Sequence, residues 1–413
     1  MESKIIKRDG YNIHLINTNK FKKIMLRVIL RRPRKENDYL ISALVDLMSL
    51  RTKLFKSKRE RYIYEEDLYN IMFSAYVTRY GMETELVFGS SFIDPDIVGE
   101  DFLEDAIKYP FDLIKNPLFD ESLLDDVKTG MIKRYNRLME DYDYYVDVKA
   151  YDYFYDKDIY KSHLTCEPEI TKTITMKQLE DTYHEVFNNS SIDIYVTGNI
   201  ANKEEKIIEY LDKYNTFKSN CTLSDYRMYV GTRDKEQRIE ETRKGVSQTL
   251  LYMIYNIKDY DRTESMKAVL FNKMLGVGMN SKLFANVREL HKLCYAIDSS
   301  YIHINNSICI YVGLDYENVD KAINIIKDTI NSMRDITDEE LSIATNNALI
   351  GVKLSEDSLT SMFRKQCDID LHDGLTDEQN INRLKTITKE EVQSVVDDIK
   401  LNTVYILKGE EHE

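Results

Sequence analysis

The sequence contains no tryptophan, and glycine and proline are scarce, with 14 and 5 copies among 413 residues. Few turn-forming residues and a charged fraction of 31% are typical of a helix-rich α/β or α+β protein rather than of a loop-rich fold held by disulfides. The five cysteines are an odd number at irregular spacing, and no two form a C-x-x-C pair. This cysteine usage argues against a disulfide framework and favours a reducing compartment.

Long apolar runs are also missing. The stretch from Met1 to Gly10 has no apolar signal segment, and no uncharged apolar run elsewhere is long enough to cross a bilayer. We therefore expect a cytoplasmic protein with no membrane partner. The net charge of -14 disfavours nucleic acid as a partner, because such binding depends mainly on Lys and Arg side chains that neutralise phosphates.

The basic residues are concentrated in the first sixty or so positions. Four cations lie between Arg31 and Lys35, and a second group follows a little later in the chain. The second group consists of Arg51, Lys53, Lys56, Lys58, Arg59 and Arg61. One interpretation of this basic island is two solvated loops that flank a helix, and the other is electrostatic steering of an acidic peptide or partner.

The histidines offer no zinc site of the common helical kind. A hydrolytic zinc site needs three protein ligands and an open position for water. The motifs H-E-x-x-H and H-x-x-E-H place two imidazoles on one helix face, with a glutamate beside the bound water. The sequence holds seven histidines, no two of them four residues apart, and neither motif occurs. An autonomous hydrolase would therefore need a site of an unrecognised kind.

The chain contains two segments that end alike. Thr175 precedes a helical stretch from Met176 to Phe187, and a strand-like run follows. Thr388 precedes a second helical stretch, from Lys389 to Ile399, and this one is also followed by a strand-like run. Each threonine is a predicted N-cap, because its hydroxyl can accept a hydrogen bond from a backbone N–H of the first helical turn.

The beginnings of the two halves also match. Ile24 to Leu30 and Thr249 to Tyr255 are apolar runs, and each is followed by a charged turn and a helix. A chain of 413 residues also exceeds the size of a single core. We therefore predict a duplication with an N-terminal repeat at 1–215, a linker at 216–244 with room for one strand, and a C-terminal repeat at 245–413.

One segment of the C-terminal repeat matches a known pattern. From Ser281 to Tyr295 the sequence fits S-x-L-F-x-x-V-R-E-x-x-x-L-x-Y, which resembles the substrate-binding motif of the pitrilysin/insulinase metallopeptidases, a family that includes mitochondrial processing peptidase. The resemblance implies that Arg288 and Tyr295 donate hydrogen bonds to the backbone of a peptide held as an added strand and help to stabilise the oxyanion. The alternative is that Arg288 pairs with Glu289 or another acid and that Tyr295 is a core aromatic.

The same resemblance indicates where the zinc ligands of the family are lost. The alignment puts Ala43 and Leu47 at the two ligand histidines and Asp46 at the catalytic glutamate. The third ligand, a glutamate, would fall near Arg134 or Tyr135, and no carboxylate lies between Asp126 and Glu140. Asp46 is then interpreted as a solvated or capping helix carboxylate. We predict no catalytic residue and no metal or other cofactor in this chain.

The resemblance also implies a fold and a function. The expected fold is α+β, with two homologous α/β repeats, each an antiparallel sheet covered by helices, that form a clamshell. In this family two homologous chains can pair, one with the zinc and the other with only the Arg and Tyr. We therefore expect a non-catalytic, substrate-binding subunit of a heterodimeric zinc peptidase that processes peptides or leader peptides with a zinc-bearing H-x-x-E-H partner. The alternative is a peptide-binding or assembly protein of the same fold without a role in proteolysis.

Overall fold

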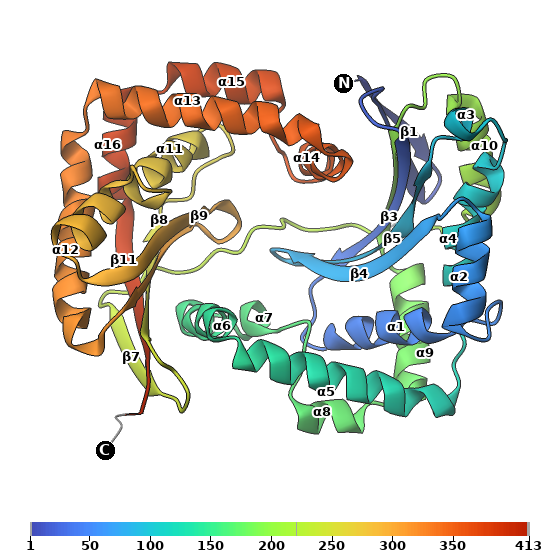
Figure 1. Cartoon of the computed structure of the whole chain (residues 1–413), viewed down its shortest axis with the longest axis horizontal. Coiled ribbons are helices and arrows are strands. Elements are labelled where there is room, and N and C mark those ends of the chain that lie inside the picture. Colours follow the sequence, from blue (N-terminus) through green and yellow to red (C-terminus); the bar gives the residue numbers. More distant parts are fainter. Residues whose placement is uncertain (1, 220, 411–413) are drawn as a thin grey trace. The chain divides into compact units, whose positions relative to one another are not determined.

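The computed structural model describes residues 2–219 and 221–410, which form two compact units (Figure 1). The sequence predicts a boundary at residue 215, and the units differ from it because one segment of the first half folds with the second. Within the described residues, no helix combines the length and apolar character needed to cross a membrane. The N-terminal unit comprises Met1–Arg137 and Ser162–Tyr226, and the C-terminal unit comprises Leu138–Lys161 and Arg227–Glu413.

The N-terminal unit is built on a six-stranded sheet with the order β1-β2-β6-β3-β5-β4. The pairing is antiparallel except between β2 and β6. Alternate residues of the central strand β3, from Ile24 to Leu30, are fully buried, as expected for one face of a strand against a core. The strands are β1 Glu2–Arg8, β2 Tyr11–Asn17, β3 Lys23–Pro33, β4 Met72–Tyr80, β5 Glu83–Ile93 and β6 Ser191–Gly198.

Helices cover this sheet, and apolar side chains of α1, α4, α9 and α10 join those of the strands in one core. The predicted cap at Thr175 is confirmed, because its hydroxyl accepts a hydrogen bond from the backbone N–H of Gln178 in a capping box. The helices of the unit are α1 Tyr39–Leu50, α2 Lys58–Asp67, α3 Pro95–Val98, α4 Leu103–Lys115, α5 Leu124–Glu140, α8 Pro168–Thr173, α9 Met176–Asn188 and α10 Glu204–Tyr214.

The C-terminal unit repeats this topology. Its five-stranded sheet has the order β7-β11-β8-β10-β9, which corresponds to β2-β6-β3-β5-β4 in the first sheet. The pair β7 and β11 is parallel, as are β2 and β6, so each sheet departs from the predicted antiparallel pairing at the same place. The strands are β7 Gln237–Thr242, β8 Thr249–Ile257, β9 Cys294–Ile302, β10 Ser307–Leu314 and β11 Ile399–Lys408.

Both faces of this second sheet are covered by helices. Leu251, Met253 and Tyr255 of β8 pack into the core with α11, α12 and α16, whereas Tyr252 and Ile254 face α6. Because α6 packs on this sheet, residues 138–161 belong to the C-terminal unit, although they come from the first half of the sequence. The helices are α6 Tyr142–Phe154, α7 Asp158–Lys161, α11 Ser265–Gly276, α12 Val319–Ser332, α13 Asp338–Leu354, α14 Leu359–Leu371, α15 Asp377–Thr386 and α16 Lys389–Asp398.

The first part of the basic island is buried in ion pairs. Arg31 donates to Glu83 at 3.0 Å and to Asp193 at 3.2 Å, and Arg32 donates to Asp38 at 2.7 Å. The interpretation as a solvated loop is therefore wrong for these two arginines, which anchor the end of β3. The later cations of the island remain at the surface: Arg51, Lys53, Lys56, Lys58 and Arg59 are exposed.

Candidate functional site

The segment that carries Arg288 and Tyr295 begins at a tight turn after α11. Gly276 ends this helix, and a Cβ there would lie 2.1 Å from Oγ of Ser299, so that a larger residue would collide. Gly278 has a φ of +81°, a left-handed conformation that favours glycine. Oγ of Ser281 then accepts a hydrogen bond of 3.3 Å from the backbone N–H of Phe284. These contacts fix the start of the following helical segment.

Phe284–Leu290 form a π-helical segment rather than an ordinary α-helix. Just beyond it, the backbone N–H of His291 donates to the carbonyl of Asn286 at 3.1 Å, which is the wide spacing of a π-turn. Leu283 and Val287 are fully buried and anchor the segment in the core of the C-terminal unit. Such π-turns are frequent at functional sites, and here the turn leaves the remaining residues of the segment at the surface.

Arg288 lies on the outer side of this segment. Its side chain is 44% exposed, and its Nε is 4.0 Å from Oε1 of Glu289, at the limit of an ion pair. An exposed pair at that distance contributes little stability. The guanidinium also lies over the ring of Phe284, with its Cζ 4.8 Å from the ring centre. The alternative interpretation, in which Arg288 merely pairs with Glu289, therefore explains little of the placement of this side chain.

Tyr295 follows at the start of β9 and is 64% exposed. Its hydroxyl donates to Oδ2 of Asp315 at 3.4 Å, a long hydrogen bond. The alternative that Tyr295 is a core aromatic is therefore wrong. Within the residues that the structure describes, β9 pairs with β10 alone and ends the order of the sheet (Figure 1). An edge strand of this kind offers unpaired backbone groups to an added strand.

The side chain of Cys294, the residue directly before Tyr295, is buried. Burial raises the pKa of its thiol to about 11, and the nearby charge of Arg288 offsets only part of this effect. The thiol is therefore neutral near pH 7 and a poor nucleophile. Cys294 is therefore a packing residue of this core.

The positions aligned with the zinc-binding histidines contain no ligand atoms. Ala43 and Leu47 are fully buried on one face of α1. They belong to an apolar cluster with Val127 and Met131 of α5 and Leu179 of α9. An apolar core therefore stands where the alignment places the two imidazoles.

Asp46, at the position of the catalytic glutamate, forms an ion pair with Arg134 of α5. Nη1 of Arg134 donates to Oδ1 of Asp46 at 3.2 Å, and Nη2 donates to Oδ2. Asp46 is thus ion-paired, and with a side chain that is 28% exposed it also remains partly solvated. Arg134 is also the residue near which the third zinc ligand was expected. A guanidinium thus faces the carboxylate that would otherwise activate the zinc-bound water.

A cavity of about 490 Å³ adjoins this ion pair. Its wall contains four cations and two carboxylates, and most of it comes from α5, at positions 126, 127, 130, 133, 134 and 137. We did not predict this cavity from the sequence, although the helical spacing of the basic residues was a usable signal. The lining residues are Asp46, Ser49, Leu50, Lys58, Asp126, Val127, Gly130, Lys133, Arg134 and Arg137.

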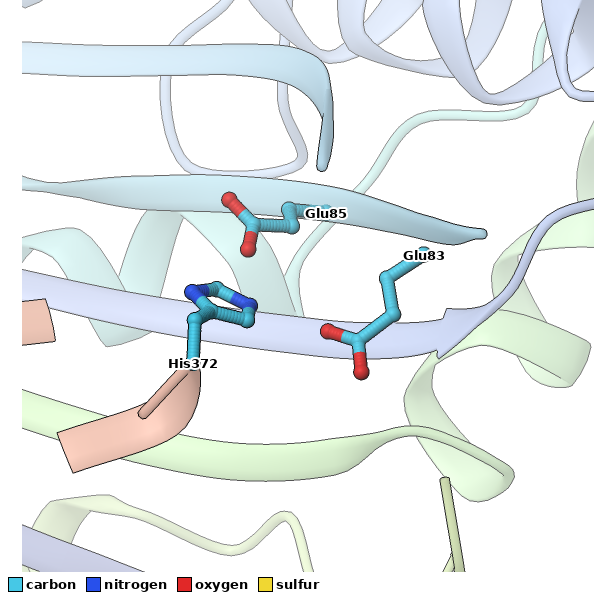
Figure 2. Close-up of side chains that lie close together, drawn as sticks. All are labelled: Glu83, Glu85 and His372. Atoms are coloured by element: carbon cyan, nitrogen blue, oxygen red, sulfur yellow. The ribbon is translucent and has the colours of Figure 1, made fainter. Parts of the chain in front are cut away.

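Figure 2 shows three other side chains with ligand atoms, and they come from different units. Glu83 and Glu85 project from β5, and Glu83 accepts a hydrogen bond from Arg31 at 3.0 Å. His372 follows α14, and its carbonyl accepts hydrogen bonds from Arg262 at 3.2 and 3.0 Å. The two carboxylates of the N-terminal unit are fewer than the three ligands that a zinc site needs.

A cavity of about 530 Å³ in the C-terminal unit is lined in part by Tyr301 and His303. Burial, followed by the charges of Arg262 and Arg227, lowers the pKa of His303 from 6.5 to about 4. The carboxylates of Asp259 and Asp368 act in the opposite direction.

This lowered pKa predicts a loss of stability in acid. Between pH 6.5 and about 4 the unfolded chain takes up a proton at His303 before the folded chain does, so the free energy of unfolding falls as the pH falls. After discounting for solvent exposure, we expect a contribution of about 1 to 2 kcal/mol. Urea unfolding of wild type and His303→Gln across this pH range measures the contribution of His303 to the free energy of unfolding. Identical pH profiles of that free energy for the two proteins would contradict the prediction.

Comparisons with known proteins agree with these features. A family model described as the peptidase M16 inactive domain matches residues 173–347, which include Arg288 and Tyr295. YmfF of Bacillus subtilis, a probable inactive metalloprotease, is 24% identical over 427 aligned positions that cover 98% of this chain and 97% of that protein.

Solved structures share the fold over the full length of both chains. A conserved protein from Enterococcus faecalis has a TM-score of 0.92 at 19% identity. A peptidase M16 inactive domain from Pseudomonas fluorescens has a TM-score of 0.79 at 15% identity. The chain is thus similar to M16 metallopeptidase relatives that are themselves described as inactive. Its α+β fold of two helix-covered sheets is the M16 fold, as the sequence pattern predicted.

Proposed function

We propose that this chain is the non-catalytic, substrate-binding subunit of a heterodimeric zinc peptidase that processes peptides or leader peptides. A homologous partner with an intact H-x-x-E-H motif supplies the zinc and the activated water. The observation that carries the proposal is a contrast between two sites. Arg288 and Tyr295 are exposed beside an edge strand, whereas Ala43 and Leu47 are buried in an apolar cluster.

The chemistry of the exposed donors fits a peptide held as an added strand. The open edge of β9 can pair with the peptide backbone, while Arg288 and Tyr295 donate hydrogen bonds to its carbonyls. In a closed site next to a partner's zinc, such donors stabilise negative charge that develops on the scissile carbonyl oxygen. This chain contributes binding and orientation, because Ala43 and Leu47, at the aligned zinc-ligand positions, offer no ligand atom to a metal that could activate water.

A small cavity beside the glycine turn supports the same function. It measures about 230 Å³, and Met274, Val277 and Ile343 are among its apolar walls. On its polar side, Lys282 donates to Glu340 at 2.7 Å. A cavity of this size and character suits one apolar side chain of a bound peptide.

Complex formation tests the proposed pairing. The chain is mixed with a homologue that carries H-x-x-E-H, and the mixture is analysed by size-exclusion chromatography with light scattering and by zinc analysis. We expect a 1:1 complex with one zinc ion per pair of chains. A paralogous but unpaired M16 peptidase serves as the control for non-specific association. Separate elution of the two chains at micromolar concentration would contradict the proposal.

A second candidate function is peptide binding or assembly without proteolysis. The open edge of β9 favours it, because strand addition needs no zinc-bearing partner. The two functions differ in their dependence on the zinc-bearing chain. The proposed subunit binds that chain and changes its activity. A stand-alone binding protein binds peptide equally well with and without that chain.

A further inference from the structure

We propose that the cavity beside Asp46 and Arg134 binds a carboxylate side chain of an acidic peptide. The inference rests on the proposed function insofar as both take a peptide as the ligand. It concerns a different place, because this cavity lies in the N-terminal unit and Arg288 and Tyr295 lie in the C-terminal unit. It adds a charge preference to the peptides that this chain accepts.

Charge balance in the cavity wall is the first argument. Lys58, Lys133, Arg134 and Arg137 line a cavity of about 490 Å³ together with Asp46 and Asp126. The wall is therefore positive, although the whole chain carries a net charge of -14. Cations gathered in one concave surface raise the local concentration of anions there.

The internal ion pair leaves three of the four cations of the wall without an ion-pair partner there, and the wall keeps a net charge of two positive units when Asp126 is also counted. Asp46 is bound by Arg134, so its charge is already matched within the wall. Lys58, Lys133 and Arg137 form no ion pair with any carboxylate in the part of the chain that the structure describes. Their side chains are exposed, so each can turn towards a ligand without breaking an existing contact.

The two acidic residues of the wall decide which anion fits. Asp46 and Asp126 repel a phosphate dianion or a polyanion, but they can accept hydrogen bonds from the N–H groups of a peptide. Leu50 and Val127 add apolar surface for the methylene groups of a glutamate side chain. A mixed wall of this kind suits a single carboxylate within a peptide rather than a nucleotide.

A dipeptide probe tests the cavity apart from β9, because it is too short to form an added strand. Acetyl-Glu-Glu-amide and acetyl-Gln-Gln-amide are titrated into the chain alone at low ionic strength, with saturation-transfer NMR as the readout. We expect the acidic probe to bind roughly tenfold more tightly than the neutral one, since two exposed ion pairs account for about that factor. Added salt reduces the preference.

Matched double variants locate the effect. Lys58→Gln with Lys133→Gln removes one cation from α2 and one from α5 at the cavity, and we expect it to abolish the preference. Arg59→Gln with Lys128→Gln removes the same charges from the same helices outside the cavity, and we expect the preference to persist. Asp46→Asn frees Arg134 and should strengthen binding of the acidic probe several-fold, a direction opposite to that of a merely destabilising change.

Three outcomes would overturn the inference: equal binding of the two dipeptides by wild type, an equal loss of the preference in both double variants, or tighter binding of inorganic phosphate than of the acidic probe.

The proposed function has a separate readout. Arg288→Ala with Tyr295→Phe should weaken binding of a longer peptide and leave the dipeptides unaffected. If the two dipeptides bind equally well but the longer peptide still depends on Arg288 and Tyr295, only the cavity proposal is rejected. If the acidic dipeptide is preferred but the longer peptide does not depend on Arg288 and Tyr295, only the proposed function is rejected.

Discussion

Replacing Arg288 by alanine in the proposed two-chain peptidase is expected to lower kcat/KM by roughly 10² to 10³. The guanidinium is 44% exposed and held only by a 4.0 Å contact with Glu289 and by the ring of Phe284, so its donors remain available to a substrate carbonyl. Removing a donor to a developing oxyanion costs a factor of this size in other hydrolases. Steady-state cleavage of a labelled peptide measures this fall in kcat/KM.

Companion variants separate the role of Arg288 from general damage to the segment. Arg288→Lys retains the charge and loses the planar fork, so an intermediate rate is expected. Tyr295→Phe removes one hydroxyl donor and should cost less, roughly tenfold. Lys292→Ala, a change between the two donors, should leave the rate close to that of wild type. An Arg288→Ala enzyme as active as wild type would contradict the role of Arg288 as a donor to the substrate carbonyl.

The second large effect is expected on rebuilding the lost metal site. A variant with Ala43→His, Asp46→Glu, Leu47→His and Arg134→Glu carries H-x-x-E-H on α1 and a carboxylate on α5. Without metal it should be less stable than wild type by about 3 to 5 kcal/mol, because two imidazoles enter an apolar cluster and a leucine is lost from it. With zinc it should regain stability, because the folded state then holds the metal.

Thermal unfolding with and without zinc measures this effect, together with zinc analysis of the purified variant. We expect a zinc-dependent rise in Tm and about one zinc ion per chain. A variant that keeps Arg134 has a cation at the place of the third ligand, so it should gain far less from zinc. No rise in Tm for the full variant would show that Ala43, Asp46 and Leu47 are not the lost zinc positions.

The repeat and its local signals were predictable from the sequence because they depend on neighbouring residues. Threonine caps such as Thr388 form capping boxes at the predicted positions, since a cap and its partner lie within one turn. The apolar run from Thr249 to Tyr255 lies in β8, as a short continuous apolar run followed by a charged turn indicates. The pattern around Arg288 and Tyr295 was also readable, because its residues lie close together in the chain.

Features that depend on distant residues were not predictable. Asp46 and Arg134 are 88 positions apart, so no local pattern indicates their ion pair. Packing of α6 on the C-terminal sheet and burial of Arg31 beside Asp193 likewise depend on tertiary contacts. The π-turn at Phe284–Leu290 departs from the periodicity that sequence patterns assume, because its backbone hydrogen bonds are spaced more widely than those of an α-helix.

The central claim is that this chain completes a peptidase whose zinc belongs to another chain. The most direct test is cleavage of a labelled peptide by this chain alone, by an H-x-x-E-H homologue alone, and by the two together, with zinc measured in each sample. We predict that only the mixture cleaves the peptide and that the zinc stays with the homologue. Zinc-dependent cleavage by this chain alone would contradict the account.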